Sequence, residues 1–287
     1  MKKILITGAN SYIGTSFEKW VQQWPDSYSV DTVDMIDGTW KEKDFSKYDV
    51  VFHVAGIAHV SKDPKMEKLY YKINTDLTIE TAKKAKSEGV KQFIFMSSII
   101  VYGDSSYINQ KRVIDRDTVP MPSNFYGNSK LQAEKGINQL NDGKFKVVVL
   151  RPPMIYGKDS KGNYPRLAKM AQKLPIFPDV DNERSMLHID NLCEFIKLMV
   201  DNEEEGLFFP QNKEYVRTSE LVHLIAEVHG KKIVLTKLFN PLLRILGIKL
   251  GIVNKVFGNL VYDKLISDYK ESYIINTLYE SVLVTEK

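Results

Sequence analysis

The chain is expected to fold as an α/β protein, with a doubly wound parallel sheet followed by a smaller C-terminal lobe. Short apolar runs alternate with stretches of helical periodicity throughout the first half. Strands that alternate with helices imply crossover connections and a parallel sheet. The runs lack polar alternation, which is typical of strands covered on both faces. After Arg151 prolines interrupt the pattern, and this marks a change of architecture.

The individual elements follow from these patterns. The expected strands are Lys3–Thr7, Ser29–Val33, Val50–Val54, Phe93–Ser97 and Val147–Leu150. The expected helices are Tyr12–Gln23, Lys65–Ser87, Phe125–Leu140, Pro165–Gln172, Asn191–Asp201 and Thr218–Val228. We therefore predict a cofactor domain over residues 1–150 and a substrate-binding lobe over residues 151–287. Ligands of such sheets bind beyond the C-terminal ends of the strands.

The composition limits the class of protein. The net charge of +4 arises from interspersed acids and bases, which argues against a nucleic-acid partner. Cys193 is the single cysteine, so an internal disulfide is excluded and a reducing compartment is expected. The apolar run that follows Lys3 ends at Thr7, too early for a signal peptide. No stretch of about 18 apolar residues predicts a membrane span. We expect a cytoplasmic protein without a metal site.

Residues 238–260 are apolar with scattered basic side chains, and two interpretations are open. One is a helix that lies on a membrane surface. The other is the core of the C-terminal lobe, or a lid over a substrate. The sequence favours the second, because one proline and three glycines divide the segment into short pieces: Pro241, Gly247, Gly251 and Gly258.

The first strand runs directly into a glycine-containing turn before a helix. Gly8 permits the tight turn, and the N-terminus of the helix then offers N–H groups and a positive dipole end to a pyrophosphate. Gly14 lets the helix pack closely on the sheet. The residues expected to contact the cofactor here are Gly8, Asn10, Ser11, Tyr12, Ile13 and Gly14.

Asp34 follows the second strand, about 20 residues after Gly14, where a carboxylate accepts hydrogen bonds from an adenine ribose. A carboxylate repels a 2′-phosphate, and no Arg or Lys lies between Asp34 and Lys41 to attract one. The expected cofactor is therefore NAD in preference to NADP. Asp37 is a second candidate for this contact, or simply a solvated acid of the loop.

Two segments carry the expected chemistry. Tyr126 and Lys130 are four residues apart, so on a helix they share one face. A phenol of pKa near 10 needs about 4 kcal/mol of differential stabilisation to act as a base near neutral pH, and an ammonium beside oxidised nicotinamide can supply it. Ser98 follows a central strand and is placed to hydrogen-bond the reacting oxygen.

These segments resemble the extended short-chain dehydrogenase/reductase family, in its NAD-dependent nucleotide-sugar epimerase/dehydratase group. Thr7–Gly14 resembles its TGxxGxxG loop, with Ser11 in place of the middle glycine. Ser97–Gly103 resembles its SSxxVYG segment, and the matches extend to Tyr126–Lys130, His53–Gly56 and Lys72–Asn74. The similarity covers residues 3–157 well and 180–192 moderately, whereas residues 235–287 are not recognised.

The resemblance implies a Rossmann fold and assigns roles to individual residues. Ser98, Tyr126 and Lys130 match the catalytic residues, with Ser98 and Tyr126 also touching the substrate. Ala55, Gly56, Asn74 and Lys130 match residues that line or support the cofactor site. A homodimer is also implied.

Three local features bear on the reaction. Sugar dehydratases of the family carry an Asp-Glu pair after the catalytic Ser or Thr, but Ile99 and Ile100 stand there and cannot transfer protons. Residues 184–190 resemble the family's RDxxHVxD segment, in which Arg184 would clamp the substrate diphosphate. A surface salt bridge is the other interpretation of Arg184. His188 and Asp190 are expected to tie the segment into the fold.

The third feature is the sequence Arg151-Pro152-Pro153-Met154, which lacks the Asn that contacts substrate phosphates in hexose 4-epimerases. The leading hypothesis is a UDP-hexose 4-epimerase-like enzyme that converts a UDP- or dTDP-linked sugar through a 4-keto intermediate. The alternative is an NAD(P)H-dependent 4-ketoreductase of such sugars. A non-catalytic, cofactor-sensing protein is a third hypothesis, against which the presence of Ser98, Tyr126 and Lys130 argues.

Overall fold

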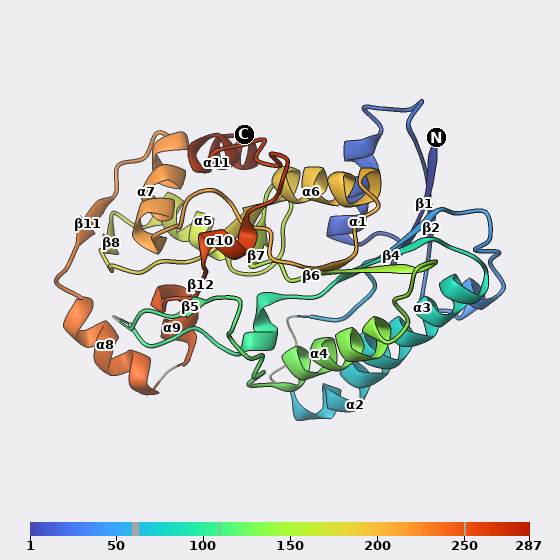
Figure 1. The fold of residues 1–287 in the computed structure, drawn as a ribbon. Coiled ribbons are helices and arrows are strands. Elements are labelled where there is room, and N and C mark those ends of the chain that lie inside the picture. Colours follow the sequence, from blue (N-terminus) through green and yellow to red (C-terminus); the bar gives the residue numbers. More distant parts are fainter. Residues whose placement is uncertain (59–62, 109, 250) are drawn as a thin grey trace. The chain divides into compact units, whose positions relative to one another are not determined.

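The computed structural model describes residues 1–58, 63–108, 110–249 and 251–287 (Figure 1). Leu250, within the apolar segment 238–260, lies outside the described residues. The chain forms two compact units. The first comprises Met1–Gly103, Val119–Pro152 and Leu192–Pro210, and the second comprises Asp104–Thr118, Pro153–Asn191 and Gln211–Lys287. Each unit therefore combines three segments of the chain: residues 104–118 belong to the second unit, and residues 192–210 belong to the first. The division into a cofactor domain over 1–150 and a substrate-binding lobe over 151–287 stays a prediction.

The first unit contains a six-stranded parallel sheet in the order β10-β6-β4-β3-β1-β2, so the predicted doubly wound fold is confirmed. Its strands are β1 (Lys2–Thr7), β2 (Tyr28–Val33), β3 (Val50–His53), β4 (Gln92–Met96), β6 (Lys146–Leu150) and β10 (Gly206–Phe208). The order reverses at β1, which has β2 on one side and β3 on the other. The C-terminal ends of β1 and β3 therefore flank the crevice in which such sheets bind ligands.

Helices cover both faces of this sheet. Figure 1 shows α1 (Tyr12–Val21) and α6 (Ile189–Asp201) on one face, and α3 (Leu77–Ser87) and α4 (Phe125–Asn138) on the other. The short turn η1 (Thr39–Lys41) lies between β2 and β3. Buried apolar side chains such as Phe93 fill the space between sheet and helices. Double coverage explains why the inner strands β3, β4 and β6 are largely apolar, whereas the edge strand β2 carries Ser29, Asp31 and Thr32.

The prediction that Lys65–Ser87 is helical is confirmed, but the helix is not uniform. The segment consists of a 3₁₀ turn η2 (Pro64–Met66), then α2 (Glu67–Tyr70), a π-helical turn η3 (Tyr71–Asp76) and α3. Within η3, Thr75 Oγ1 donates to the carbonyl of Ser129 at 2.8 Å, which ties the widened turn to α4. Helical periodicity does not reveal such a turn, because it depends on a contact with a distant helix.

The strand β10 was not predicted. It is only three residues long and follows three consecutive glutamates, so its apolar run is too short to predict a strand. It nevertheless pairs in parallel with β6, with Leu207 opposite Val149. This pairing, together with α6, returns Leu192–Pro210 to the first unit.

The second unit consists of short parallel strand pairs and helices around their own core. The pairs are β12 (Val261–Tyr262) with β5 (Val113–Ile114), β7 (Met154–Tyr156) with β9 (Met186–His188), and β11 (Val234–Thr236) with β8 (Ile176–Pro178). The helices are α5 (Tyr164–Lys173), α7 (Thr218–Val228), α8 (Asn240–Lys249), α9 (Gly251–Phe257), α10 (Lys264–Ser267) and α11 (Leu278–Glu286). Val222 and Ile225 of α7 are completely buried in this core.

The segment 238–260 is only partly the core element that the sequence favoured. Phe257 and Leu260 are buried, but several apolar side chains of α8 and of the turn before it are exposed. Within the described ranges, we find no helix with the length and apolar character needed to span a membrane.

Candidate active site

The loop between β1 and α1 brings its backbone close to the loop after β3. Gly8 has a φ of +106°, and a Cβ added there would lie 2.8 Å from the backbone nitrogen of Ala55. No side chain is therefore tolerated at this position. Ser11 caps α1, because its Oγ accepts a hydrogen bond from the Gly14 N–H at 3.2 Å. The Ser11 hydroxyl proton then remains able to donate to a phosphate.

Asp34 lies directly after β2 and is exposed. Its Oδ1 accepts a hydrogen bond from the Ile36 N–H at 2.7 Å, which leaves lone pairs for other donors. The Asp37 carboxylate forms hydrogen bonds within its own loop. It accepts hydrogen bonds from the N–H of Thr39 at 3.0 Å and from its hydroxyl at 2.7 Å, and these two bonds lower the pKa of Asp37.

The loop after β3 is held by Asn74, which lies in η3 and is completely buried. Its Oδ1 accepts from the Ile57 N–H at 2.9 Å. Its Nδ2 donates to the Ile57 carbonyl at 3.1 Å and to Ser129 Oγ at 3.2 Å. A Cβ added to Gly56 would lie 3.0 Å from Asn74 Oδ1 and 3.2 Å from Lys130 Nζ. The bare backbone of Gly56 is therefore what fits beside Lys130.

His53, at the end of β3, belongs to the framework beneath the site. Its ring nitrogens bond Thr7 Oγ1 at 2.7 Å and Thr78 Oγ1 at 3.0 Å, which joins β1, β3 and α3. Burial, and secondarily the charge of Lys130, lower the pKa of His53 to about 3. The imidazole is therefore neutral.

Tyr126 and Ser98 come together at the end of β4. α4 begins where the Asn124 side chain accepts from the Gly127 N–H at 3.0 Å, which places Tyr126 in the first turn. Ser98 Oγ accepts from the Ile100 N–H at 3.3 Å. Burial and the neighbouring Tyr70 raise the pKa of Tyr126 to about 12, while a hydrogen bond from Ser98 acts in the opposite direction.

Lys130 lies one turn further along α4 and is buried. Its Nζ donates to the Met96 carbonyl at 2.9 Å and lies 4.7 Å from the centre of the Phe95 ring. Burial lowers the pKa of Lys130 to about 8, and the carboxylate of Glu134 opposes this shift. The amine thus lies near the end of β4 and near Gly56. The group that lowers the pKa of Tyr126 is Ser98 and not Lys130.

A buried ionic network supports these residues and was not predicted from the sequence. The Arg151 guanidinium binds Glu134 through two hydrogen bonds of 3.1 and 2.5 Å and donates to Tyr102 OH at 2.6 Å. Ser97 Oγ also donates to Glu134. Glu134 is four residues after Lys130, so the same helix face carries Tyr126, Lys130 and Glu134. That spacing was the available signal.

The first unit thus offers features that fit the two ends of a dinucleotide. The Gly8 turn and the capped N-terminus of α1 suit a pyrophosphate, and the exposed carboxylate of Asp34 suits ribose hydroxyls. Lys130, beside the bare Gly56, faces the end of the central strand β4. The residues present therefore fit NAD.

Arg184 belongs to the second unit, where paired backbone holds it. Its N–H donates to the Val216 carbonyl at 3.1 Å, and its Nη1 donates to Ser105 Oγ at 3.3 Å and to the Gly258 carbonyl at 3.2 Å. Burial lowers the pKa of Arg184 to about 10. Over the described ranges, no acidic side chain forms an ion pair with it. The Arg184 guanidinium is thus partly buried and hydrogen-bonded to a hydroxyl and a carbonyl group. Within the described residues it does not form the surface salt bridge that was the other interpretation.

His188 and Asp190 hold the following segment in place, as expected. His188 is buried, and its N–H donates to Asn212 Oδ1 at 3.0 Å. Its Nε2 contacts Thr285 Oγ1 at 3.3 Å, and Asp190 accepts from Asn276 Nδ2 at 3.0 Å.

Comparison with known proteins gives consistent matches. The model of the NAD-dependent epimerase/dehydratase family matches residues 4–209. A UDP-glucose 4-epimerase of Vibrio cholerae is 31% identical over 94% of this chain and 89% of that enzyme. An N-acetyl-α-D-glucosaminyl-diphospho-ditrans,octacis-undecaprenol 4-epimerase of Escherichia coli O157:H7 is 30% identical over 68% of this chain and 60% of that enzyme.

Solved structures share the fold. A dTDP-4-dehydrorhamnose reductase of Clostridium acetobutylicum superposes with a TM-score of 0.75 at 20% identity, over 99% of this chain and 98% of the other. A UDP-glucuronic acid 4-epimerase of Bacillus cereus in complex with NAD has a TM-score of 0.75 at 19% identity, over 99% and 95%. The family match and the related epimerases show that the chain is an enzyme, which argues against the non-catalytic, cofactor-sensing hypothesis. The extent of the family match and the 31% identity to the Vibrio enzyme place the chain in the NAD-dependent epimerase/dehydratase family.

Proposed function

We propose that the enzyme is a 4-epimerase of nucleotide-linked hexoses that works through a 4-keto intermediate. The observation that carries this proposal is the placement of Ser98 at the end of β4, where it lowers the pKa of Tyr126 against the effect of burial, with Lys130 buried one turn further along α4. The identity to the UDP-glucose 4-epimerase of Vibrio cholerae supports it independently.

In the proposed reaction, Tyr126 takes the proton of the sugar 4-hydroxyl while hydride leaves the same carbon. NAD supplies the hydride acceptor and, in its oxidised form, a positive charge. Ser98 accepts from the Ile100 N–H, so its hydroxyl proton can donate to the reacting oxygen or to Tyr126. Once hydride returns to the other face of the carbon, Tyr126 gives the proton back. Lys130 remains charged below about pH 8, and together with bound oxidised nicotinamide its ammonium would favour the phenolate form of Tyr126.

The chain's own residues hold the cofactor in two groups. The loop residues Gly8, Asn10, Ser11, Tyr12, Ile13 and Gly14 bind the pyrophosphate, and Asp34 binds the adenine ribose. At the other end Ala55, Gly56 and Lys130 line the cofactor. Asn74 is a positioning residue that acts through the backbone of Ile57, because its side chain bonds Ile57 and Ser129 within the described part of the chain.

Asp34 is expected to make the enzyme bind NAD more tightly than NADP. Its carboxylate bonds ribose hydroxyls and repels a 2′-phosphate, and a lost charge-assisted bond corresponds to roughly 10- to 150-fold in affinity. Asp34→Ala should therefore reduce the preference for NAD, which calorimetry with both cofactors can measure. Asp37→Ala is the matched control, because that carboxylate already serves Thr39. Equal affinities in the wild type would contradict the assignment.

Arg184 is expected to bind the substrate diphosphate. Since no carboxylate of the described residues neutralises this cation, Arg184→Ala should weaken substrate binding by about 10- to 150-fold and leave NAD affinity nearly unchanged. Arg184→Lys should recover only part of the loss, because an ammonium cannot replace the planar fork. Titration of each variant with UDP-sugars measures this.

Arg217 provides the matched control for that titration. It belongs to the same unit but already pairs with Asp179 at 2.9 Å. Arg217→Ala should leave substrate affinity unchanged. If Arg184→Ala has no effect on any UDP- or dTDP-sugar, another residue holds the diphosphate.

A 4-ketoreductase that uses NAD(P)H is the second candidate. Met154 stands where hexose 4-epimerases carry the Asn that contacts the substrate phosphates. This departure keeps open a reductase, which takes up a 4-keto sugar and consumes NAD(P)H, whereas an epimerase forms the 4-keto sugar itself and releases the epimer. A carrier other than a nucleotide is suggested by the Escherichia coli relative, whose name specifies a sugar on undecaprenyl diphosphate.

One panel separates these candidates. UDP-, dTDP- and undecaprenyl-diphosphate-linked sugars, and their 4-keto forms, are incubated with NAD or NADH and analysed by chromatography. An epimerase interconverts two sugars with catalytic NAD, whereas a ketoreductase consumes NADH in step with product. The failure of every compound would reject a sugar diphosphate as substrate. The implied homodimer stays a prediction, which light scattering can check.

A further inference from the structure

Helix α8 presents an apolar stripe to solvent. Leu242, Ile245 and Ile248 are 55%, 58% and 72% exposed and recur every three residues on one side of the helix. The turn before the helix extends the stripe, with Leu238 84% and Phe239 44% exposed. Contiguous exposed apolar side chains of this size indicate a surface that binds something.

The opposite side of α8 is fixed to the second unit, so the exposure of the stripe follows from packing. Leu243 packs against the core of that unit. The Gly247 carbonyl accepts a hydrogen bond from Asn254 Nδ2 of α9 at 2.7 Å. Figure 1 shows α8 beside α9 at the margin of this unit. The helix cannot turn its apolar stripe inward without breaking these contacts.

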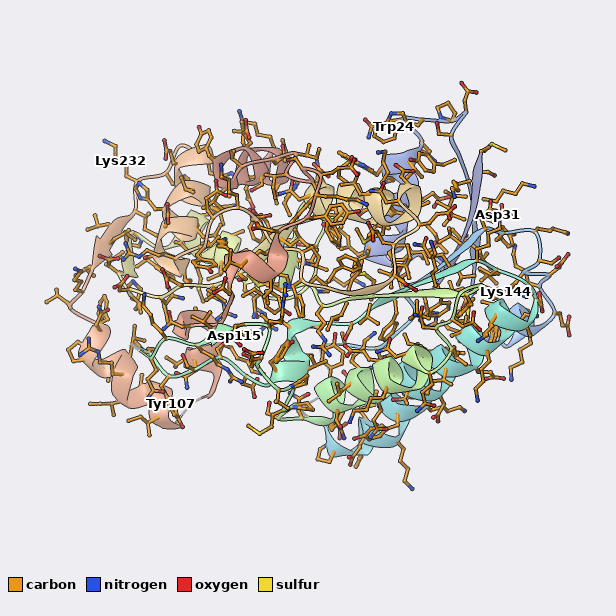
Figure 2. The ribbon with its side chains drawn as sticks, in the orientation of Figure 1. Trp24, Asp31, Tyr107, Asp115, Lys144 and Lys232 are labelled. Carbon is orange, nitrogen blue, oxygen red and sulfur yellow. The ribbon has the colours of Figure 1, made fainter. Side chains whose placement is uncertain are left out.

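The stretch of sequence that carries the stripe contains basic residues only, although Lys255 pairs with Asp104 from another segment at 3.8 Å. Residues 230–262 contain six basic residues and no acidic one. The basic residues are Lys231, Lys232, Lys237, Arg244, Lys249 and Lys255. Lys237 and Arg244 are exposed next to and on α8. Lys231 and Lys232 are also exposed, and Figure 2 shows Lys232 at the end of β11 that is remote from α8. Such a surface complements an anionic partner.

We propose that α8 and the turn 237–239 dock on the surface of a bilayer that contains anionic phospholipid. Apolar side chains flanked by lysines are the pattern of a helix that lies in a membrane interface, and lysines near an anionic leaflet add electrostatic attraction. A second copy of the chain fits less well, because a symmetric interface would bring the same basic residues together. This inference does not depend on the proposed reaction.

Vesicle flotation tests the proposal with the full-length protein. The wild type should float with phosphatidylglycerol/phosphatidylcholine vesicles, and less with pure phosphatidylcholine or at high salt. The triple variant Leu242→Glu, Ile245→Glu, Ile248→Glu should lower partitioning by about 100-fold, roughly fivefold for each partly buried side chain. Replacing Lys231, Lys232 and Lys237 by Gln should lower partitioning on anionic vesicles by at least about tenfold.

The matched control places three glutamates elsewhere on the same unit, at Leu265, Tyr279 and Val284, which are 75%, 49% and 47% exposed. It should bind vesicles like the wild type. Circular dichroism checks that every variant is folded, and the lysine variants keep the test valid if the glutamate triple variant unfolds. No flotation of the wild type, or equal flotation of the α8 and control variants, would overturn the proposal. So would a dimer that the α8 variant abolishes in the absence of vesicle binding.

Discussion

Replacement of Tyr126 by Phe is expected to reduce turnover by about 10²- to 10⁴-fold, because it removes the group that accepts and returns the substrate proton. NAD affinity should stay within a few-fold of the wild type. The ring itself is retained, and it packs at 5.8 Å from the Tyr70 ring. Single-turnover kinetics with the best substrate of the panel measures the first quantity, and calorimetry measures the second.

Tyr71 offers a control of the same kind. Its hydroxyl accepts a hydrogen bond from Asn128 Nδ2 at 2.8 Å on α4, but it has no assigned part in the chemistry. Tyr71→Phe should therefore keep most of the activity. If Tyr126→Phe turned over at a rate near that of the wild type, the assigned proton transfer would be wrong, whatever the substrate.

Replacement of Glu134 by Ala is expected to lower the free energy of unfolding by about 3–5 kcal/mol, because it leaves the Arg151 charge buried without its partner. Both side chains are almost completely buried, at 4% and 7% exposure. The double variant Glu134→Leu, Arg151→Met should recover most of the loss, since a buried pair can be replaced by apolar groups at little cost. Urea denaturation of the single and double variants measures both effects.

A second measurement tells whether Glu134 also tunes the active site or only stabilises the fold. Glu134 raises the pKa of Lys130 against the lowering effect of burial. Without the carboxylate, the pKa of Lys130 should fall below about 8, and the ammonium would be lost at a lower pH. The alkaline limb of the pH–rate profile of folded Glu134→Gln should therefore shift to lower pH. An unshifted profile would reduce Glu134 to a structural role.

Much of the first unit could be predicted because its signals are local. Most inner strands of the sheet are apolar runs, and the Gly8 turn and the Tyr126–Lys130 pair are each formed by residues that are close together in the sequence. The π-turn at Tyr71–Asp76 and the short strand β10 depend on distant partners, α4 and β6. Periodicity therefore could not reveal them.

In the site, too, local features could be predicted from the sequence, but contacts between distant segments could not. The sequence placed Lys130 on the face of Tyr126, but the direction of its amine, toward the Met96 carbonyl, depends on where β4 ends. The link from Glu134 to Arg151 spans 17 residues and two elements. The exposed stripe of α8 could not be predicted either, because it depends on how the helix packs. The glycines and the proline suggested a broken core element, whereas packing on one side only leaves the other side in solvent.

The central claim is that the enzyme removes hydride from the sugar carbon whose hydroxyl proton goes to Tyr126. The most direct test uses UDP-glucose deuterated at carbon 4, or the equivalent form of the panel substrate that is converted, with catalytic NAD and chromatography coupled to mass spectrometry. The account predicts that the product keeps the deuterium at carbon 4 and that the chemical step shows a primary isotope effect. Exchange of the deuterium with water would mean that the carbon loses a proton instead of hydride, and this result would contradict the account.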